Sequence, residues 1–481
     1  MPGSPGTTAD DLAMELIPMT QPDGARPDLL LEGHIPPDRE RRYLSVPFAV
    51  PPGVGQLIIC YDYSDRIASD PDLAGGSTLD IGLFDERGDE AGGPGFRGWS
   101  GSARRQFTVG ERWATPPYRP GPTRAGQWSV LLGPYKVPSH GTDYRVEITF
   151  SGEQSAELPP EAAAPPLAAL PARTMAPPAE SGWVRADLHS HTVFSDGDSW
   201  PAETIAAAWA AGLDVVGITD HNSAISAADY AAGLAGGPLL VPGVEMTTYG
   251  GHWNAWAAPG VTGHRWYDFR EPDQASTERA MAAAVADGAL VSINHPKPLG
   301  PMWEYPGVRS FHAVEVWNGA WPKLNAAALA YWEALLRAGH RVTVIGGSDT
   351  HRLRDSRRPR FGFPEAQFGQ PTTFLRTGDG PPTIAAVHAA IRRGDVFITE
   401  SPDGPELYVH QNTEDGIAIH VVGARGDTLS VIGPDGAVHA AAVPADDWTT
   451  GVAWPIESPW LRVQISDRLG QMRALSNAVW R

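Results

Sequence analysis

Cysteine is almost absent from this 481-residue chain, which contains only Cys60. A single thiol excludes an intrachain disulfide framework and a thiolate metal cluster, so any metal ligands must be histidines and carboxylates. Basic charge is also scarce, because 37 Lys and Arg face 56 Asp and Glu, which gives a formal net charge of −19. A field of that sign repels nucleic acid and anionic membranes, and we expect neither as a partner.

Long apolar runs and targeting signals are missing as well. No run of 18 apolar residues indicates a transmembrane helix, and the N-terminal residues lack the charged-then-apolar pattern of a secretory signal. We therefore expect a cytoplasmic protein. The remaining composition, with 42% hydrophobic and 19% charged residues, is typical of a folded chain, and its length allows several domains.

Composition along the chain divides it into five regions. Residues 1–29 form a tail without a regular period, and residues 153–182 form an Ala/Pro-rich linker. Residues 30–152 contain short β-like runs between turns, which predicts an antiparallel, jelly-roll-like β-sandwich. Over 183–402 strands alternate with Ala-rich helices, which predicts an α/β barrel of about seven βα units. Residues 403–481 return to β-like runs and predict a small β appendage packed on the barrel.

The β-sandwich carries no catalytic motif, and two roles are open to it. Exposed Trp and Tyr side chains would bind sugar or protein, whereas aromatic side chains in the core would make the domain a lid or an oligomerisation module. General statistics of protein interiors favour the structural role. That role allows a homo-oligomer formed through the β-domains.

Two histidines follow the first predicted barrel strand, which spans residues 184–188. Alternate residues of a strand point to one face, so His189 and His191 project side by side and suit a divalent transition metal. Asp196, in the loop that follows, is placed to add an oxygen ligand. A His-x-His motif alone is weak evidence for a metal site, and it needs partners from elsewhere in the chain.

Side chains able to bind metal also follow the other predicted barrel strands. They are Asp220, His221, Asn222, Glu245, His252, Asn294, His295, Glu315, Asn318, Asp349 and His351. Functional residues of a βα barrel gather at the C-terminal ends of the strands, so these side chains should converge. Helix caps would instead favour Ser, Thr, Asp or Asn, and would not place His after five strands.

These motifs resemble those of the PHP (polymerase and histidinol phosphatase) superfamily. The motifs are Asp187-Leu188-His189-Ser190-His191, Thr219-Asp220-His221-Asn222, Gly243-Val244-Glu245, His295-Pro296 and Ser348-Asp349-Thr350-His351. Glu315-Val316-Trp317-Asn318-Gly319, Gly251-His252 and the preceding β-domain are similar to its CehA/McbA branch, the carbaryl-hydrolase-like metallohydrolases. The resemblance implies a distorted (βα)7 barrel with two or three divalent metal ions, for which Zn, Mn and Fe are the candidates.

The resemblance also implies roles for particular residues. The implied metal ligands are His189, His191, Asp196, His221, Glu245, His252, His295, Asp349 and His351. Ions that share Glu245 or an aspartate would activate a bridging hydroxide as the nucleophile, while one ion polarises the bond under attack. We expect Asp220, His252 and His351 to take part in catalysis, with Asp220 orienting a ligand histidine.

The rim loops contain cations and aromatic side chains that bear on the substrate. Lys297, Arg352 and Arg354 are placed either to meet an anionic oxygen or simply to solvate the rim. The aromatic residues of the same loops favour an aryl or apolar group, and they are Trp253, Trp256, Trp303, Tyr305, Trp317, Trp321 and Phe363.

We therefore predict a phosphoesterase that acts on a small molecule with an apolar or aryl group. The residues expected to contact this substrate are Lys297, Trp253, Trp317, Asn318 and Arg352. Hydrolysis of a carbamate or aryl ester, as in the carbaryl hydrolases, is the alternative. An alternative of another class is a binding function that resides in the β-sandwich.

Overall fold

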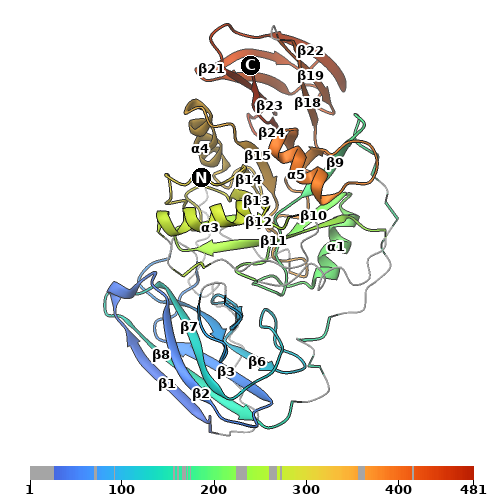
Figure 1. The fold of residues 1–481 in the computed structure, drawn as a ribbon. Helices are drawn as coiled ribbons and strands as arrows, with labels where there is room; N and C mark the ends of the chain where they lie inside the picture. The colour runs from blue at the N-terminus through green and yellow to red at the C-terminus, as the bar shows by residue number, and fades with distance from the viewer. Residues whose placement is uncertain are drawn as a thin grey trace, which may run out of the picture.

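The protein is strand-rich and consists of an N-terminal β domain, a central α/β part and a C-terminal group of strands (Figure 1). The computed structural model describes residues 26–69, 73–90, 93–154, 158–159, 162–164, 170, 172–173, 175–223, 236–258, 268–270, 273–355, 363–413 and 416–481. Most of the predicted tail and part of the predicted linker lie outside these residues.

Two antiparallel sheets of four strands each form the N-terminal domain. Their strand orders are β1-β8-β3-β6 and β2-β7-β4-β5, the arrangement of an eight-stranded jelly roll. The elements are β1 (Leu29–Ile35), η3 (Pro37–Arg39), β2 (Leu44–Val50), β3 (Gln56–Tyr63), β4 (Thr78–Phe84), β5 (Phe96–Trp99), β6 (Gln106–Gly110), β7 (Gly126–Lys136) and β8 (Thr142–Ser151). Leu57, Ile59, Trp128 and Val146 are fully buried in the core that both sheets share, because alternate side chains of each strand point inward.

The central part contains six of the seven strands expected to run parallel, whereas the seventh, at residues 396–399, pairs antiparallel with both its neighbours. The six are β9 (Trp183–Asp187), β10 (Val215–Ile218), β11 (Leu239–Thr248), β13 (Leu290–Ile293), β14 (Ala313–Asn318) and β15 (Thr343–Gly347). β9, β10 and β11 pair in parallel, as do β13, β14 and β15. The last of them returns to the first, since Asp349 N donates to His189 O and His191 N donates to Thr350 O, each over 3.0 Å.

Antiparallel strands interrupt this series and correct the expectation of uniform βα units. β12 (Gly251–Trp256) runs antiparallel between β11 and β13, because the Tyr249–Gly250 turn is far too short for a parallel crossover. β16 (Thr372–Arg376), a strand not expected from the sequence, and β17 (Val396–Thr399) extend the sheet beyond β9, again with antiparallel pairing.

Helices flank the central sheet, and capping side chains set several of their ends. They are α1 (Pro201–Ala210), α3 (Gln274–Ala286), α4 (Asn325–Arg337) and α5 (Ile384–Arg393). Asp273 accepts a hydrogen bond from Ser276 N at the start of α3, and Thr383 accepts one from Ala386 N at the start of α5. Gly394 ends α5 in the left-handed conformation that glycine adopts without strain.

The C-terminal strands continue the central sheet, a connection that the prediction of a β appendage packed on the barrel did not include. They are β18 (Glu406–Thr413), β19 (Gly416–Val422), β20 (Thr428–Gly433), β21 (Gly436–Ala442), β22 (Asp447–Ala453), β23 (Trp460–Ser466), β24 (Met472–Ser476) and β25 (Val479–Trp480). β24 pairs with β17, so a single sheet runs from the central part into this region. Phe374 and Phe397 of the central part also share a hydrophobic core with Leu407 and Leu461.

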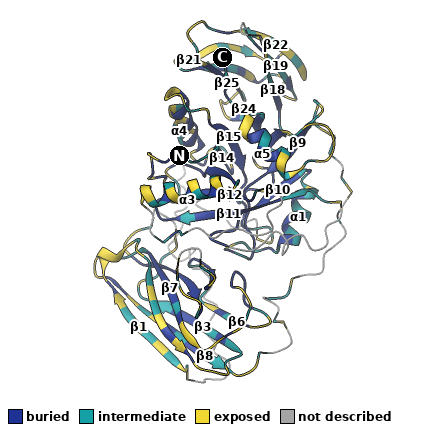
Figure 2. Cartoon of the chain, viewed as in Figure 1, coloured by how far each residue is buried: buried dark blue, intermediate teal, exposed yellow. Residues whose placement is uncertain are grey.

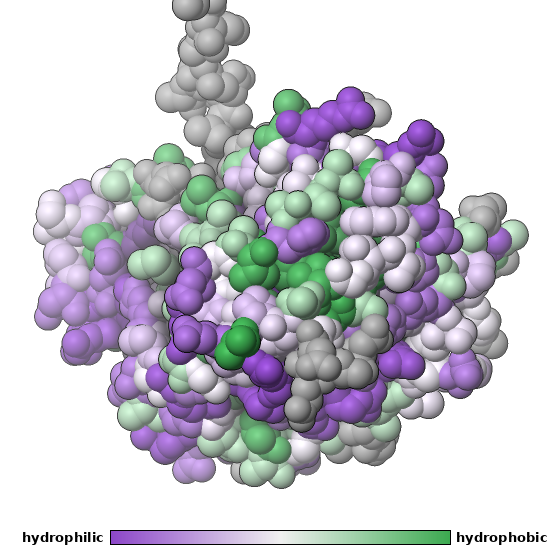
Figure 3. Space-filling model, turned by 90° about the horizontal axis from the view of Figure 1, so that it is seen from above, coloured by the Kyte–Doolittle hydropathy of each residue, from purple (hydrophilic) through white to green (hydrophobic). Residues whose placement is uncertain are grey.

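Burial follows this arrangement (Figure 2). Every residue of β9 is buried, whereas exposed and half-buried residues alternate along β22. Seen from the end that carries the C-terminal strands, the surface is mostly hydrophilic, with hydrophobic residues gathered near its centre (Figure 3). None of the helices in the described residues combines the length and hydropathy needed to cross a bilayer.

The N-terminal domain packs on the central part around Tyr249. The Tyr249 ring stacks on Tyr43 with centroids 5.1 Å apart, and its hydroxyl donates to Asp80 Oδ2 over 2.8 Å. Arg41 also pairs with Glu304 at 2.9 Å. Tyr249 lies between Glu245 and His252 in the chain, so this contact connects the β-domain to a loop that bears two of the predicted metal ligands.

Stability should depend on pH through Asp80. Burial raises the pKa of its carboxyl group to about 7, although Tyr249 donates a hydrogen bond to it. The unfolded-chain pKa is about 4, so the folded state binds this proton more tightly and loses stability as pH rises from about 4 to about 7. We expect Asp80→Asn to remove about 3 kcal/mol of the change in unfolding free energy between pH 5 and 8.

Urea unfolding at several pH values measures this difference. The exposed Asp379→Asn is the matched control and should leave the pH dependence unchanged. If the Asp80→Asn and wild-type curves run parallel between pH 5 and 8, Asp80 is not the group responsible.

Candidate metal centre

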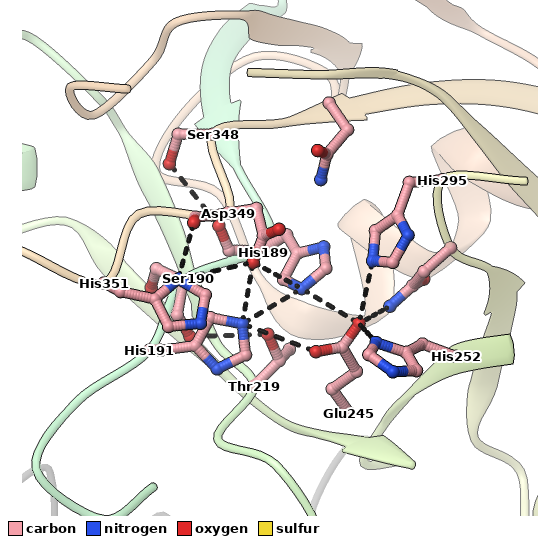
Figure 4. A network of polar contacts seen from close by, with 12 residues as sticks. His189, Ser190, His191, Thr219, Glu245, His252, His295, Ser348, Asp349 and His351 are labelled. Carbon is pink, nitrogen blue, oxygen red and sulfur yellow. Dashed lines mark hydrogen bonds and ion pairs between the residues drawn. The ribbon is translucent and has the colours of Figure 1, made fainter. Parts of the chain in front are cut away.

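The predicted ligands lie together at the end of the central sheet where the parallel strands finish, and Figure 4 shows most of them, without Asp196 and His221. His189 and His191 follow β9, His221 follows β10, and His295 follows β13. Glu245 and His252 lie on β11 and β12, and Asp349 and His351 follow β15. Asp196 comes from the loop after β9 and lies 3.2 Å from His351 Nε2 and 3.5 Å from His221 Nε2.

Glu245 occupies the middle of this cluster and is fully buried. Its Oε1 atom lies 3.3 Å from His189 Nε2, 3.2 Å from His252 Nδ1 and 3.2 Å from His295 Nε2, and its Oε2 atom lies 2.8 Å from His221 Nδ1 and 3.4 Å from His191 Nε2. Burial opposes the charged form, but the surrounding histidines hold the pKa of Glu245 well below its ordinary value. Glu245 is therefore an anion that faces five imidazoles.

The cluster divides into three overlapping groups in which the ligand atoms lie within 4.8 Å of one another. The groups are His191, Asp196, His221 and His351; His189, His191, Glu245 and Asp349; and His221, Glu245 and His252. His191, His221 and Glu245 each belong to two groups. Such sharing is what adjacent ions bridged by common ligands require.

Several ring nitrogens of the cluster face one another, which tests whether metal ions fit. His189 Nε2 faces His191 Nε2 at 3.2 Å, and His221 Nε2 faces His351 Nε2 at 3.5 Å. A hydrogen bond within either pair needs a proton on one nitrogen and a lone pair on the other, so at least one nitrogen of each pair presents a lone pair. His252 Nε2 is buried without a hydrogen-bond partner among the described residues. Imidazole nitrogens and carboxylate oxygens arranged in this way fit divalent ions such as Zn, Mn or Fe.

The pKa values of the two histidines of the His-x-His motif are shifted in opposite directions. Burial, together with His351 and His221, lowers the pKa of His191 well below its ordinary value, so this ring is neutral and able to bind a metal. Burial also acts to lower the pKa of His189, but Glu315 and Glu245 raise it well above the ordinary value. The carboxylates around His189 thus make it the more basic ligand.

A buried polar chain orients His189 from behind. Glu315 Oε1 lies 2.9 Å from His189 Nδ1, and Asn318 Nδ2 donates to Glu315 Oε2 over 3.3 Å. Lys297 Nζ donates to Asn318 O, Asn318 Oδ1 and Asn325 Oδ1 over 2.9 to 3.1 Å. Lys297 Nζ thus makes all three contacts inside the protein, the residue is 2% exposed, and burial lowers the pKa of its amino group to about 7. The prediction that Lys297 and Asn318 contact substrate is therefore not supported, because both side chains support Glu315.

Asp220 holds the loop that carries His191 and Asp196. Its carboxylate accepts hydrogen bonds from Thr192 N, Thr192 Oγ1 and Ser195 Oγ, each over 2.7 Å. The orienting role expected of Asp220 is thus exerted on the backbone that positions the ligands.

Two carboxylates that support the centre were not assigned such a role from the sequence. Asp187 accepts hydrogen bonds from Ser348 N at 3.1 Å and Gly369 N at 2.9 Å, which connects β9 to the loop after β15. Burial raises the pKa of Asp187 to about 6. Glu365 Oε1 accepts from His351 N at 2.6 Å. The supporting role of Asp187 could have been predicted from its position at the end of an apolar strand. No feature of the sequence singled out Glu365.

Backbone strain is concentrated at this end of the strands. Asn222, His295 and Asp349 have φ angles of 44°, 30° and 54°, in the left-handed region that side chains seldom adopt. Each follows the end of a strand and lies beside or within the ligand set. Surrounding structure must hold such conformations in place, and strain of this kind clusters at functional sites.

Most of the aromatic residues expected to line a substrate pocket lie in the core instead. Trp253 and Trp317 are 1% and 2% exposed and belong to the main hydrophobic cluster, so the prediction that they contact substrate is not supported. On β12 the reason is strand alternation, because His252 faces the metal-ligand cluster and Trp253 must then face the opposite side. Trp256, Trp303 and Tyr305 are buried as well.

The rim cations are also mostly engaged. Arg354 pairs with Glu203 at 2.7 Å. Arg352 is half-buried, directly follows His351, and forms no ion pair within the part of the chain that the structure describes. Of the three rim cations predicted to meet an anion, Arg352 is the one left to do so.

The N-terminal domain reaches the loop of the first motif. Arg104 Nη2 donates to Val193 O over 3.3 Å, on the segment between His191 and Asp196. Together with the Asp80–Tyr249 hydrogen bond, this places contacts from the β-domain on two loops of the centre.

Comparison with known proteins gives few matches. No family model matches the sequence, and no curated protein matches it. Among solved structures, one similar chain is described as a two-domain protein containing a predicted PHP-like metal-dependent phosphoesterase from Bacteroides vulgatus ATCC 8482. It is 16% identical, with a TM-score of 0.38, and the match covers 65% of this chain and 100% of that chain. A likeness this low assigns nothing to this chain, and the case for its function depends on the site itself.

Proposed function

We propose that this protein is a metal-dependent hydrolase of the PHP type, in its CehA/McbA branch, and that it cleaves a phosphoester in a small molecule with an apolar or aryl group. The observation that carries the proposal is the convergence of histidines and carboxylates on Glu245. Their overlapping groups and facing ring nitrogens favour two or three divalent ions. The β-domain acts as a structural cover, which its contacts with both loops support.

When bound, divalent ions supply Lewis-acid polarisation and lower the pKa of a water molecule. The residues that would hold them are His189, His191, Asp196, His221, Glu245, His252, His295, Asp349 and His351, and Glu245 directs one oxygen to each side of the cluster. Ser348 is not a nucleophile in this scheme, because it is buried and its hydroxyl donates to His189 O.

Substrate approaches from the side of Asp196 and Asp349. These side chains are 32% and 20% exposed, whereas those of the ligand histidines are at most 10% exposed. Arg352 lies on the same loop as Asp349 and is the cation placed to meet a phosphoryl oxygen.

Hydrolysis of carbamates or aryl esters is the second candidate. One observation favours it, namely that Lys297 and Arg354 are engaged elsewhere and leave little positive charge to select a phosphate. Arg352 therefore distinguishes the two candidates.

Metal analysis combined with a substrate panel tests the proposal. The panel is bis-p-nitrophenyl phosphate, p-nitrophenyl phosphate and an aryl methylcarbamate, each assayed with and without chelator. We expect bound divalent metal, loss of activity on chelation, and recovery when metal is restored. Metal-free protein with unchanged activity would overturn the proposal.

The variant Arg352→Gln identifies the bond that is cleaved. If phosphoesters are the substrates, kcat/KM for the phosphates should fall by about 10- to 100-fold, since hydrogen bonds to charged groups are worth about 1.5–3 kcal/mol. The exposed Arg279→Gln is the matched control and should have no effect. Preferential turnover of the carbamate, unaffected by Arg352→Gln, would favour the second candidate.

A further inference from the structure

A cavity of about 560 Å³ lies between the central part and the C-terminal strands. Its lining comes from the beginnings of β9, β15 and β17, the ends of β16 and α5, and the segments around β18 and β25. The metal-ligand cluster lies at the other end of β9. From Trp183 at the start of β9 to His189 the chain advances six residues, or roughly 20 Å at the rise of a strand. The cavity is therefore separate from the metal centre.

Positive charge dominates this cavity, in a chain with a net charge of −19. Four arginines line it, Arg341, Arg376, Arg392 and Arg393, and the lining contains one carboxylate, that of Asp395. Asp395 neutralises Arg393, with 2.8 Å between Oδ2 and Nε. Acidic residues outnumber basic ones in the whole chain, so the charge of this cavity is more positive than that of the average surface of the protein.

Of the remaining arginines, Arg341 and Arg376 are the ones placed to bind an anion. Arg392 donates to the backbone oxygens of Gly288 and Ala289. Arg341 lies over the Trp480 ring at 5.1 Å, and Arg376 is exposed. No carboxylate of the described residues forms an ion pair with Arg341, Arg376 or Arg392.

Trp183 also lines this cavity, and the residue is 8% exposed. Its indole ring therefore lies where a ligand bound in the cavity would change its environment.

We propose that the cavity binds a small polyanion through its phosphate or carboxylate groups, with Arg341 and Arg376 as the main contacts. The planar guanidinium group binds either anion through two parallel hydrogen bonds. A volume of 560 Å³ is within the range of small-ligand pockets, about 300–1,000 Å³. The site is independent of the hydrolytic function proposed above.

Binding to the full-length protein tests this site. The probes are methylenediphosphonate, whose carbon–phosphorus bonds resist phosphoester hydrolysis, and tricarballylate, a tricarboxylate. Calorimetry gives the affinity, and the indole resonance of Trp183, assigned with Trp183→Phe, reports the location in a protein labelled with ¹⁵N-tryptophan. We expect one or both probes to bind and to shift this resonance, and the tighter probe distinguishes phosphate from carboxylate ligands.

Two double variants make the test specific. Arg341→Gln with Arg376→Gln should weaken binding at least 10-fold and leave hydrolysis at the metal centre unchanged. Arg425→Gln with Arg468→Gln removes the same charge from exposed positions outside the cavity and should leave the affinity unchanged. If the first double variant fails to fold, the single variant Arg376→Gln replaces it and should weaken binding about 3- to 10-fold.

Three results would overturn the proposal. They are absence of binding for both probes, equal weakening by the two double variants, and binding that leaves the Trp183 resonance in place. A DNA duplex that binds through Arg341 and Arg376 more tightly than either small probe would also overturn it, since the occupant would then be a nucleic acid.

Discussion

Glu245→Gln is expected to lower kcat/KM by about 10³-fold or more, which corresponds to about 4 kcal/mol of lost transition-state stabilisation. Glutamine keeps the shape of the side chain but removes the negative charge that faces five imidazoles. Its NH₂ group would also point a donor at ring nitrogens that should face a cation. We therefore expect the bound metal to fall together with the activity.

Metal content per chain and turnover of the best substrate measure the effect of Glu245→Gln. The exposed Glu457→Gln makes the same chemical change away from the site and should match the wild type. A Glu245→Gln protein with full metal content and full activity would remove Glu245 from the centre.

Glu315→Gln is expected to weaken metal binding by about 10- to 100-fold, the usual effect of removing the partner of a metal-binding histidine. Glu315 accepts the Nδ1–H of His189, which leaves the Nε2 lone pair directed at the cluster. A neutral amide supports this tautomer less strongly and makes His189 a weaker ligand.

Competition with a chromophoric chelator gives the metal dissociation constant, with the exposed Glu153→Gln as the control. Gly347→Ala provides an independent route to the same defect without a change in charge. A Cβ atom at Gly347 would lie 2.6 Å from both Glu315 Oε1 and His189 Cβ, so the pair must separate. If both variants retain wild-type metal affinity, the Glu315–His189 contact does not support the centre.

Residue types and their order along the chain were enough to predict that the ligand set converges. The strands before His189, His221, Glu245, His295 and Asp349 are short apolar runs, and the C-terminal ends of such strands meet when they pair in parallel. The turn spacing of the N-terminal domain likewise predicted its antiparallel β-sandwich. Both inferences depend on periodicity, which is a property of local sequence.

Other features depend on which segments become neighbours, and only the tertiary structure decided these. Trp253 is a core residue because β12 turns back between β11 and β13. The place of Lys297 after His295-Pro296 suggested a substrate contact. In the structure its Nζ atom instead contacts Asn318 and Asn325, and it supports Glu315 through Asn318.

The arginine-lined cavity depends on tertiary structure as well, since β9, β15, α5 and β25 contribute to it from positions far apart in the chain. The sequence by itself determined the chemistry of the centre, because ligand type and strand position are local properties. The burial, hydrogen-bond partners and solvent access of a side chain are set by contacts between distant segments. These contacts decided which of the remaining side chains can reach a substrate or ligand.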